Sequence, residues 1–346
     1  MQIKKLIYGQ LDKAYCLNFL KLKDGMAIVA ASEKRGGACS RYDFATGAET
    51  PVWTDAGGTM TICQTGDDGS FLAVQNFFMG FQAETARIVR AIPEGDGYRS
   101  DSVYTELPFV HRFGLISAAD GSETYLVACT VTTAKDKRED WSRPGSVLVS
   151  PFADASQPPK FTEIAKMHKN HGYWHGKFDG DDLLFLSGQE GLMALYPPKT
   201  KGQAFQMTCI LPREISDAVA VDIDGDGQDE ILAIEGFHGN HVTLNKRVAG
   251  TWQVVYEFEA EFAHALWAGN LLGQNSFLVS YRRNAAELLL LRMGQDGNMV
   301  RTCIASSIAT PNIDVYQEDG KAYVVAADRS DPQSEKTVVY VLSENA

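Results

Sequence analysis

The sequence predicts an all-β protein: a seven-bladed β-propeller closed by an amino-terminal strand that completes the last blade. Three observations lead to this prediction. A turn built on Asp-Gly or on Gly recurs seven times, an apolar run follows each turn, and no stretch of comparable length shows helical periodicity. The turn glycines lie 44 to 59 residues apart, close to the roughly 40–50 residues of a four-stranded blade. They are Gly25, Gly69, Gly121, Gly180, Gly225, Gly273 and Gly320.

The second strand of each predicted blade is the clearest element, because the run after each turn is rich in β-forming residues and has the length of a buried strand. These runs are residues 26–31, 71–74, 125–130, 183–186, 231–234, 277–280 and 322–326. The last unit offers only residues 313–316, 322–326 and 337–342, so it lacks one strand. We expect residues 3–8 to fill this place, because an amino-terminal strand would close the ring and remove its exposed edges.

A pair of β-sandwiches is the alternative architecture that the pattern leaves open. No linker rich in Pro, Gly or Ser divides the chain, so the preferred interpretation is a single propeller domain over residues 1–346. The longest irregular stretch is residues 133–159, which contain several prolines and a charged run at 135–140. We interpret this stretch as a loop insertion within the third blade.

Composition limits the classes of partner and the compartment. The net charge of −12, without any Lys/Arg block, argues against nucleic-acid binding through phosphates. No apolar run reaches the length of a membrane span, and residues 1–13 lack the apolar core of a secretory signal. The six cysteines stand singly in apolar stretches without a CxxC pair, so we expect buried free thiols in a reducing cytoplasm. The oligomeric state stays open.

The most specific motif is an acidic loop at residues 222–230. Carboxylates occupy its positions 1, 3, 5 and 9, and glycines occupy positions 4 and 6, where the chain turns sharply. Alternate residues of a tight loop can direct several oxygens at one point, as a calcium ion requires. A merely acidic hairpin is the alternative. The predicted calcium ligands are Asp222, Asp224, Asp226, Glu230 and, through its backbone carbonyl, Gln228.

Residues 221–232 resemble an FG-GAP/VCBS-type propeller repeat. This resemblance implies a propeller with calcium held in the hairpin between the first and second strands of a blade, as a structural ion and not as a catalyst. The acidic pattern is intact in this blade alone, because the turns at residues 120–121 and 179–182 keep only part of it. We therefore expect one calcium site.

Propeller topology predicts which polar residues share a face. The starts of the first strands and the loops after the second strands lie on one rim, whereas the acidic loop lies on the opposite face. Counting back about nine residues from each turn glycine marks His111, His171, Asp217 and His264 at corresponding places in separate blades. Each histidine alone is more typical of a structural role, but their common register predicts that they meet at the central pocket.

The rest of this rim adds charged side chains and aromatic rings. This mixture suits a small polyhydroxylated or carboxylated molecule, because a guanidinium group pairs with a carboxylate in a fork and aromatic faces stack on sugar rings. A small carbohydrate-type ligand is therefore the predicted partner. The residues expected to bind it are Arg112, Glu190, Glu235, His238, Arg282 and Arg283.

Residues 264–273 and 279–283 are similar to a propeller blade of aldos-2-ulose dehydratase-like proteins, and residues 170–176 repeat the pattern. The resemblance covers two or three blades and includes none of the additional domains of those larger enzymes. It implies the removal of water from a keto-sugar with the help of a bound divalent metal.

Two functions follow from these residues. The first, which we favour, is a carbohydrate-active lyase or dehydratase acting on a keto-sugar or uronide, in which a histidine removes a proton next to a carbonyl or carboxylate. Two or three histidines together with a carboxylate could instead hold a divalent transition metal such as zinc or manganese, leaving open positions for substrate oxygens. The second is a non-catalytic scaffold that binds glycans or proteins, a common role of propellers. The catalytic candidates are His171, His264, His111, Asp217 and Tyr281.

Overall fold

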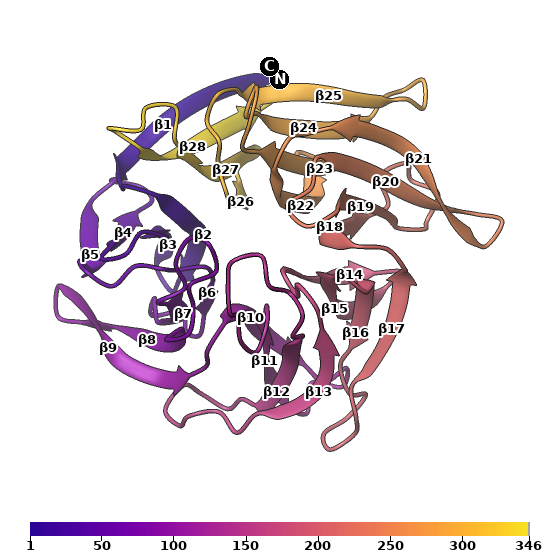
Figure 1. The fold of residues 1–346 in the computed structure, drawn as a ribbon. Coiled ribbons are helices and arrows are strands. Elements are labelled where there is room, and N and C mark those ends of the chain that lie inside the picture. Colours follow the sequence, from indigo (N-terminus) through magenta and orange to yellow (C-terminus); the bar gives the residue numbers. More distant parts are fainter. Residues whose placement is uncertain (345–346) are drawn as a thin grey trace.

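The computed structural model describes residues 1–344 and is a ring of antiparallel sheets (Figure 1). Within these residues, 28 strands form seven four-stranded sheets, and there is no helix. The predicted seven-bladed β-propeller is therefore confirmed. Consequently, no described segment is a helix that could span a membrane.

The first strand of each sheet lies innermost and contacts the first strands of the two neighbouring sheets, so that these strands surround the axis (Figure 1). The first strands are β2 (Ala14–Leu22), β6 (Ile62–Gln64), β10 (Val110–Ser117), β14 (Gly172–Phe178), β18 (Ile215–Val221), β22 (Ala263–Leu271) and β26 (Ile313–Glu318). The second strands are β3 (Gly25–Ser32), β7 (Phe71–Gln75), β11 (Thr124–Thr130), β15 (Asp181–Gly188), β19 (Glu230–Glu235), β23 (Gln274–Tyr281) and β27 (Lys321–Asp328).

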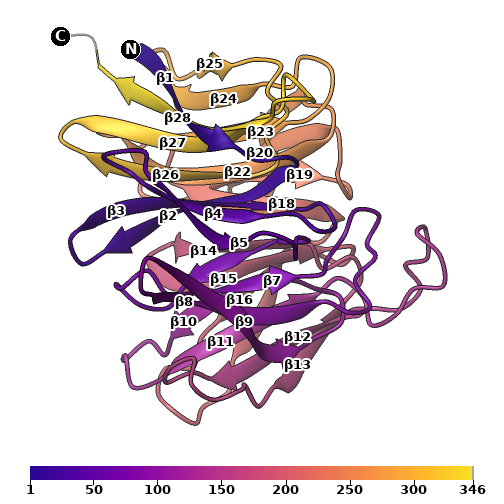
Figure 2. The same ribbon diagram turned by 90° about the vertical axis from the view of Figure 1, so that its left-hand side faces the viewer.

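The third and fourth strands lie progressively farther from the axis. The third strands are β4 (Cys39–Asp43), β8 (Arg87–Glu94), β12 (Gly145–Pro151), β16 (Gly191–Tyr196), β20 (His241–Val248), β24 (Leu288–Met293) and β28 (Lys336–Ser343). In six sheets the fourth strands are β5 (Glu49–Trp53), β9 (Gly97–Glu106), β13 (Thr162–Met167), β17 (Gln206–Leu211), β21 (Thr251–Glu259) and β25 (Met299–Ala305). The fourth strand of the seventh sheet is β1 (Gln2–Gln10), which pairs antiparallel with β28 (Figures 1 and 2).

Burial explains why the second strands dominate the sequence pattern. Both faces of a second strand pack against neighbouring blades, so all five residues of β7 are buried. The fourth strands have one face in solvent, and the first four residues of β17 are exposed. A strand that is buried on both faces gives a continuous apolar run, whereas an outer strand gives a weaker signal.

One segment differs from the sequence-based expectation. The predicted insertion at residues 133–159 contains strand β12, which pairs with β11 and β13. Val147 and Val149 point into the core and are buried, which explains why this short segment forms a strand despite the prolines on either side. The irregular segments are therefore the two loops at 131–144 and 152–161, and not one long insertion.

The cysteines are all free thiols, but they are not all buried. Cys16, Cys39 and Cys129 lie in the core, as expected. Cys209 and Cys303 are exposed because they lie on the fourth strands β17 and β25, so the prediction of burial is wrong for these two residues.

Candidate functional site

A repeated backbone feature directs side chains into the centre of the ring. At the same end of four first strands, one extra residue interrupts the pairing with the second strand. Such a β-bulge re-aims a side chain and is common next to functional sites. The extra residues are Tyr15, His111, Ser216 and His264.

A left-handed backbone turn accompanies the bulge in three of these blades and recurs before His171, where the strand pairing has no bulge. Two residues before Tyr15, His111, His171 and His264, the chain adopts a positive φ without a glycine. These residues are Lys13 (53°), Phe109 (60°), Lys169 (52°) and Phe262 (59°). Non-glycine residues with positive φ are uncommon, and such strained positions cluster at ligand sites. The four blades therefore use one local geometry to present these side chains.

Four histidines from distant parts of the chain form one cluster. The ring centroid of His171, which precedes β14, lies 4.5 Å from that of His111, 4.7 Å from that of His238 and 5.8 Å from that of His264. His238 comes from the loop between β19 and β20 and itself has a positive φ of 49°. His111, His171 and His264 are buried. The predicted meeting of these three histidines is thus seen in the structure, and His238 joins them.

Hydrogen bonds fix how the rings present their nitrogens. Nδ1 of His171 lies 3.2 Å from the carbonyl oxygen of Ser216, and Nδ1 of His264 lies 2.6 Å from that of Pro311. A carbonyl only accepts, so each Nδ1 carries the proton and each Nε2 keeps its lone pair, with His238 Nε2 beside that of His171 and the Tyr15 hydroxyl beside that of His264. Backbone acceptors behind the outer nitrogen are the usual support of metal-binding histidines.

The inner nitrogens converge at one point. Nε2 of His171 lies 3.1 Å from Nε2 of His238, and the ligand atoms of His171, His238 and His264 all lie within 4.8 Å of one another. Two nitrogens of a tetrahedral zinc site are about 3.3 Å apart, so this separation is suitable for joint binding of a cation. Three imidazoles suit zinc, copper, iron or nickel better than calcium or magnesium.

The cluster is neutral at pH 7. Burial, together with the nearby His111 and other positive groups, lowers the pKa of His171 well below its usual range. Burial is also the main cause that lowers the pKa values of His111 and His264. Burial and the guanidinium group of Arg282 lower the pKa of His238 to about 4. Neutral imidazoles can bind a metal without first losing a proton.

The histidines open into a cavity of about 230 Å³. Drug-sized ligands occupy about 300–1,000 Å³, so this cavity suits a molecule of one sugar ring. Its walls combine aromatic rings with charged groups from several blades. Besides the four histidines, the lining residues that bear on its chemistry are Tyr15, Glu33, Phe81, Phe262, Arg138, Arg282 and Arg283.

Several predicted site residues lie elsewhere. Glu190 binds His168 Nδ1 at 2.7 Å, and Glu235 binds Arg213 Nε at 2.9 Å, so both carboxylates have local partners. The Tyr281 hydroxyl donates to Glu287 and its ring packs in the core between blades. None of these three predicted residues lines the cavity, because each side chain is held by a polar partner beside it.

Asp217 and Arg112 lie in the centre of the ring but do not line the cavity. The Arg112 guanidinium donates to the carbonyl oxygen of Met60 at 2.8 Å and approaches Asn312 Oδ1 at 3.4 Å, linking distant blades. Burial raises the pKa of Asp217 to about 7. Counting back from the turn missed the bulge, so the residue that occupies the position of His264 in this blade is Ser216, not Asp217.

Three polar or charged residues that line the cavity were not predicted: Tyr15, Glu33 and Arg138. The Tyr15 hydroxyl lies 3.4 Å from Nε2 of His264, and burial raises its pKa to about 12. Tyr15 directly precedes Cys16, which lies nine residues before the turn glycine Gly25, so allowing for one extra residue in the count could have found Tyr15. Glu33 and Arg138 come from loops that differ between blades, and no sequence signal marks them.

The acidic loop between β18 and β19 forms the compact turn that the motif predicts. The Asp222 carboxylate accepts the backbone N–H groups of Gly225 at 2.7 Å and Gly227 at 2.9 Å. Oxygens of Asp222, Asp224 and Asp226 lie within 4.8 Å of one another, and the backbone N–H of Gln228 donates to Asp226. These hard oxygen donors fit calcium.

A lysine from the next strand reaches the same carboxylates. The Lys246 ammonium group donates to Asp224, to Asp226 at 2.8 Å and to Glu230 at 3.0 Å. Burial alone would lower the pKa of Lys246, but its hydrogen bonds to the three carboxylates outweigh burial and raise the pKa. Lys246 and a calcium ion would therefore compete for three of the predicted ligands.

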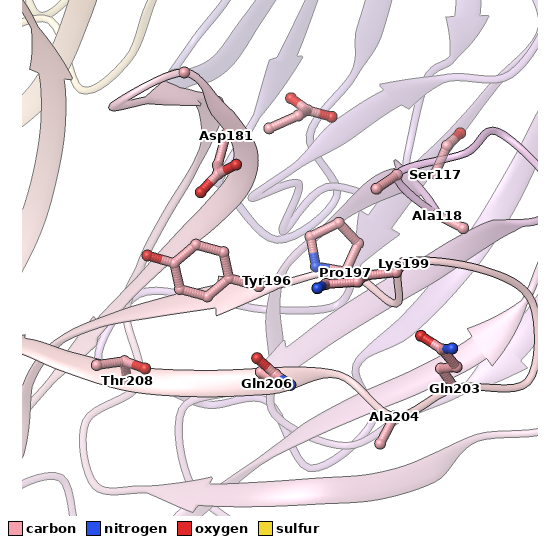
Figure 3. Close-up of a pocket in the computed structure, with 13 residues that line it drawn as sticks. Ser117, Ala118, Asp181, Tyr196, Pro197, Lys199, Gln203, Ala204, Gln206 and Thr208 are labelled. Carbon is pink, nitrogen blue, oxygen red and sulfur yellow. The ribbon is translucent and has the colours of Figure 1, made fainter.

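A larger cavity of about 640 Å³ lies between the turn after β10 and the sheet of β14–β17 (Figure 3). Its walls include Tyr196, Asp181 and Lys199, and they carry no histidine or cysteine (Figure 3). No set of metal-ligating or nucleophilic groups converges among the residues that line it. The smaller cavity at the histidines is therefore the candidate functional site.

Comparison with known proteins supports the fold and not an activity. No protein-family model matches the sequence, and no curated protein matches it significantly. A chain in the crystal structure of a mitotic checkpoint complex is 8% identical, with a TM-score of 0.60 over 99% of this chain and 91% of that one. A Thermus thermophilus protein provisionally described as an oxidoreductase (glucose dehydrogenase) is 15% identical, with a TM-score of 0.51 over 99% of this chain and 100% of that one. At these identities only the β-propeller fold is shared.

Proposed function

We propose that this propeller is a carbon–oxygen lyase that acts on a keto-sugar or uronide-type substrate in the central cavity, with a divalent transition metal held by His171, His238 and His264. One observation carries the proposal: three imidazoles from distant parts of the chain each bring one ring nitrogen to within 4.8 Å of the others, and two of the rings are oriented by backbone carbonyls. The resemblance to aldos-2-ulose dehydratase-like proteins agrees with this chemistry.

The metal would act as a Lewis acid toward a carbonyl or carboxylate oxygen of the substrate. The elimination itself needs a group that takes a proton from the carbon next to that oxygen. His111 is suited to this step because it is neutral and its buried Nδ1 has no hydrogen-bond partner within the described residues. The low pKa of His111 makes this histidine a weak base. The positive charges around the cavity must therefore lower the pKa of the C–H group from which it takes the proton.

The departing oxygen needs a proton when the carbon–oxygen bond breaks. Tyr15 keeps its proton at neutral pH because burial raises its pKa, and its hydroxyl lies at the edge of the histidine cluster. We assign it the role of proton donor. The aromatic walls exclude water from the reacting atoms.

The acidic loop has a separate role in this proposal. We infer that it binds calcium as a structural ion in a blade of the FG-GAP/VCBS type, in competition with Lys246. The loop lies between the first and second strands, at the end of its blade opposite Ser216. A calcium ion there would stabilise the blade without taking part in the reaction.

The experiment combines metal analysis with an activity panel. Purified protein is expected to contain one equivalent of a transition metal, and to eliminate water or alcohol from a member of a panel of 3-keto-sugars and uronides. His171→Ala and His264→Ala should abolish this turnover, whereas His175→Ala, which changes an exposed histidine bound to Asp182, should not. Calcium alone in the protein, with no turnover, would favour a binding scaffold instead.

A further inference from the structure

The wall of the central cavity carries an excess of positive charge, which is unusual in a protein with a net charge of −12. Arg138, Arg282 and Arg283 line the cavity, and Glu33 is its lining carboxylate. Arg283 pairs with Glu261 at 3.6 Å. Arg138 lies on an exposed loop. The charge balance of the cavity wall therefore depends on which groups pair with Arg282.

Arg282 is the cavity end of a chain of alternating charges whose inner members, Glu33, Arg329 and Glu335, are buried. Lys13 pairs with Glu335 at 2.5 Å, Glu335 with Arg329 at 3.5 Å, Arg329 with Glu33 at 2.9 Å, and Glu33 with Arg282 at 3.6 Å. Three cations thus share two carboxylates. The Arg282 contact is the longest, because Glu33 is closer to Arg329. The unmatched positive charge is therefore at the cavity end of this network.

The histidine cluster does not balance this charge. Imidazole side chains carry no negative charge, and a bound divalent cation would add two more positive charges. The guanidinium carbon of Arg282 also lies 5.3 Å from the ring centre of Phe262, another residue that lines the cavity. A guanidinium with free donors in a sheltered cavity is the typical partner of a carboxylate, which it binds in a bidentate fork.

We infer that the ligand of the central cavity carries a carboxylate that Arg282 binds, with Arg138 as a second, more exposed contact. This inference deepens the proposed function and rests on it for the choice of cavity, because the proposal alone leaves neutral keto-sugars and uronides equally open. It selects the uronide class. A carboxylate next to the reacting carbon also suits an elimination, because it conjugates with the carbanion that forms.

Isothermal titration calorimetry with three matched probes tests the inference on the full chain, saturated with zinc, at constant ionic strength. The probes are galacturonate, galactose and galactose 6-phosphate. Galacturonate should bind at least about tenfold more tightly than galactose, which corresponds to about 1.4 kcal/mol. Arg282→Gln should remove this preference, and Arg138→Gln should reduce it two- to threefold.

Arg301→Gln is a matched control. Arg301 is on the outer strand β25, where its guanidinium group lies over the ring of Phe258, so this variant should leave the preference for galacturonate unchanged. Equal binding of galactose and galacturonate, or an unchanged preference in Arg282→Gln, would overturn the inference. Tighter binding of galactose 6-phosphate than galacturonate would overturn the choice of a carboxylate. If Arg282→Gln does not fold, the wild-type probe series and the exposed Arg138→Gln variant decide.

The proposed function and this inference can fail separately. Elimination from a neutral keto-sugar without binding of galacturonate would leave a lyase and remove the carboxylate site. Binding of galacturonate that depends on Arg282, with no elimination from any uronide, would keep the carboxylate site and remove the lyase.

Discussion

The histidine cluster and the acidic loop both gather metal-ligating groups, but they are built in opposite ways. The three histidines come from positions 171, 238 and 264 and meet in the middle of the ring. The three aspartates lie within five consecutive residues, 222–226, on one exposed turn. One site depends on the closed arrangement of the blades, whereas the other needs only a hairpin.

The histidine cluster and the acidic loop also differ in the charge that an entering cation would meet. Burial lowers the pKa of His171 and keeps it neutral, whereas Asp224, Asp226 and Glu230 of the acidic loop already bind the Lys246 ammonium group. A cation entering the first site meets free lone pairs. A cation entering the second must displace a lysine. The comparison teaches that the motif that is easiest to recognise in the sequence need not be the stronger metal site.

The largest expected effect is the loss of the central metal. His264→Ala should lower zinc affinity by about 100-fold or more, because one of three ligands and its carbonyl-oriented ring are removed. Competition with a chromophoric chelator measures the affinity. His175→Ala is the control, since this histidine is exposed and paired with Asp182. Unchanged zinc affinity in His264→Ala would break the comparison, because the cluster would then not be a metal site.

A second test compares carboxyl groups in the two regions by their pH dependence. Burial raises the pKa of Asp217 from 3.8 to about 7, so ionising it costs the folded state stability as pH rises. Asp217→Asn should therefore stabilise the protein by an amount that grows between about pH 4 and 7 and then stays constant, up to about 4 kcal/mol at 1.36 kcal/mol per pKa unit. Urea unfolding at pH 4.5, 6 and 8 measures it.

Asp226→Asn, in the acidic loop, should give the opposite sign. The hydrogen bond from Lys246 lowers the pKa of Asp226, so its ionised form stabilises the folded state above its ordinary pKa. The variant should be less stable than the wild type at pH 7, and the difference should vanish as pH falls through the lowered pKa. If Asp217→Asn and Asp226→Asn changed the free energy of unfolding in the same direction at pH 7, the contrast between the two regions would be contradicted.

The third test removes the internal cation of the acidic loop. Lys246→Met should raise calcium affinity by about tenfold, because the ion no longer competes with an ammonium group for three carboxylates. Its melting temperature should fall in EDTA, since Glu230 loses its partner, and recover in calcium. Calorimetry with calcium chloride and thermal unfolding measure both effects. Lys201→Met, which breaks the pair with Glu123 outside the loop, should change neither.

The smallest expected effect is the pH dependence of zinc binding. Three histidines with ordinary pKa values of 6.5 would lose roughly 50-fold in affinity between pH 7.5 and 6.0 through protonation. The buried cluster should lose less than about twofold over the same range, because its lowered pKa values keep it neutral. Competition with the chromophoric chelator, corrected for protonation of the chelator itself, measures the zinc affinity at each pH. A loss near 50-fold would show that the cluster is accessible to water.

The parts that sequence predicts well are those that local patterns determine. The second strands and turns follow from the recurring Asp-Gly and apolar runs, and the calcium-type loop is contiguous in the chain. Of the site, His111, His171 and His264 were found through their common register, which the topology preserves. Tyr15 and Ser216 were missed by one residue, because a bulge adds a residue that the hydrophobic pattern does not reveal.

The remaining errors have a different origin. Glu190, Glu235 and Tyr281 lie where the topology suggested, but each has a polar partner beside it that holds it away from the cavity. Conversely, Glu33 and Arg138 reach the cavity from loops whose path the repeat does not define. Side-chain pairing and loop path depend on tertiary contacts, and neither leaves a periodic trace in the sequence.

The bulges at Tyr15, His111, Ser216 and His264 give the ring a modular chemistry. Four of the seven blades contribute one side chain at an equivalent bulge position, and the backbone pairing on either side does not depend on which side chain that is. Substitutions at these four positions would change the side chains beside His171 and His238 without rebuilding a blade. Evolution of new reactivity in this architecture would then need only substitutions at a few such positions.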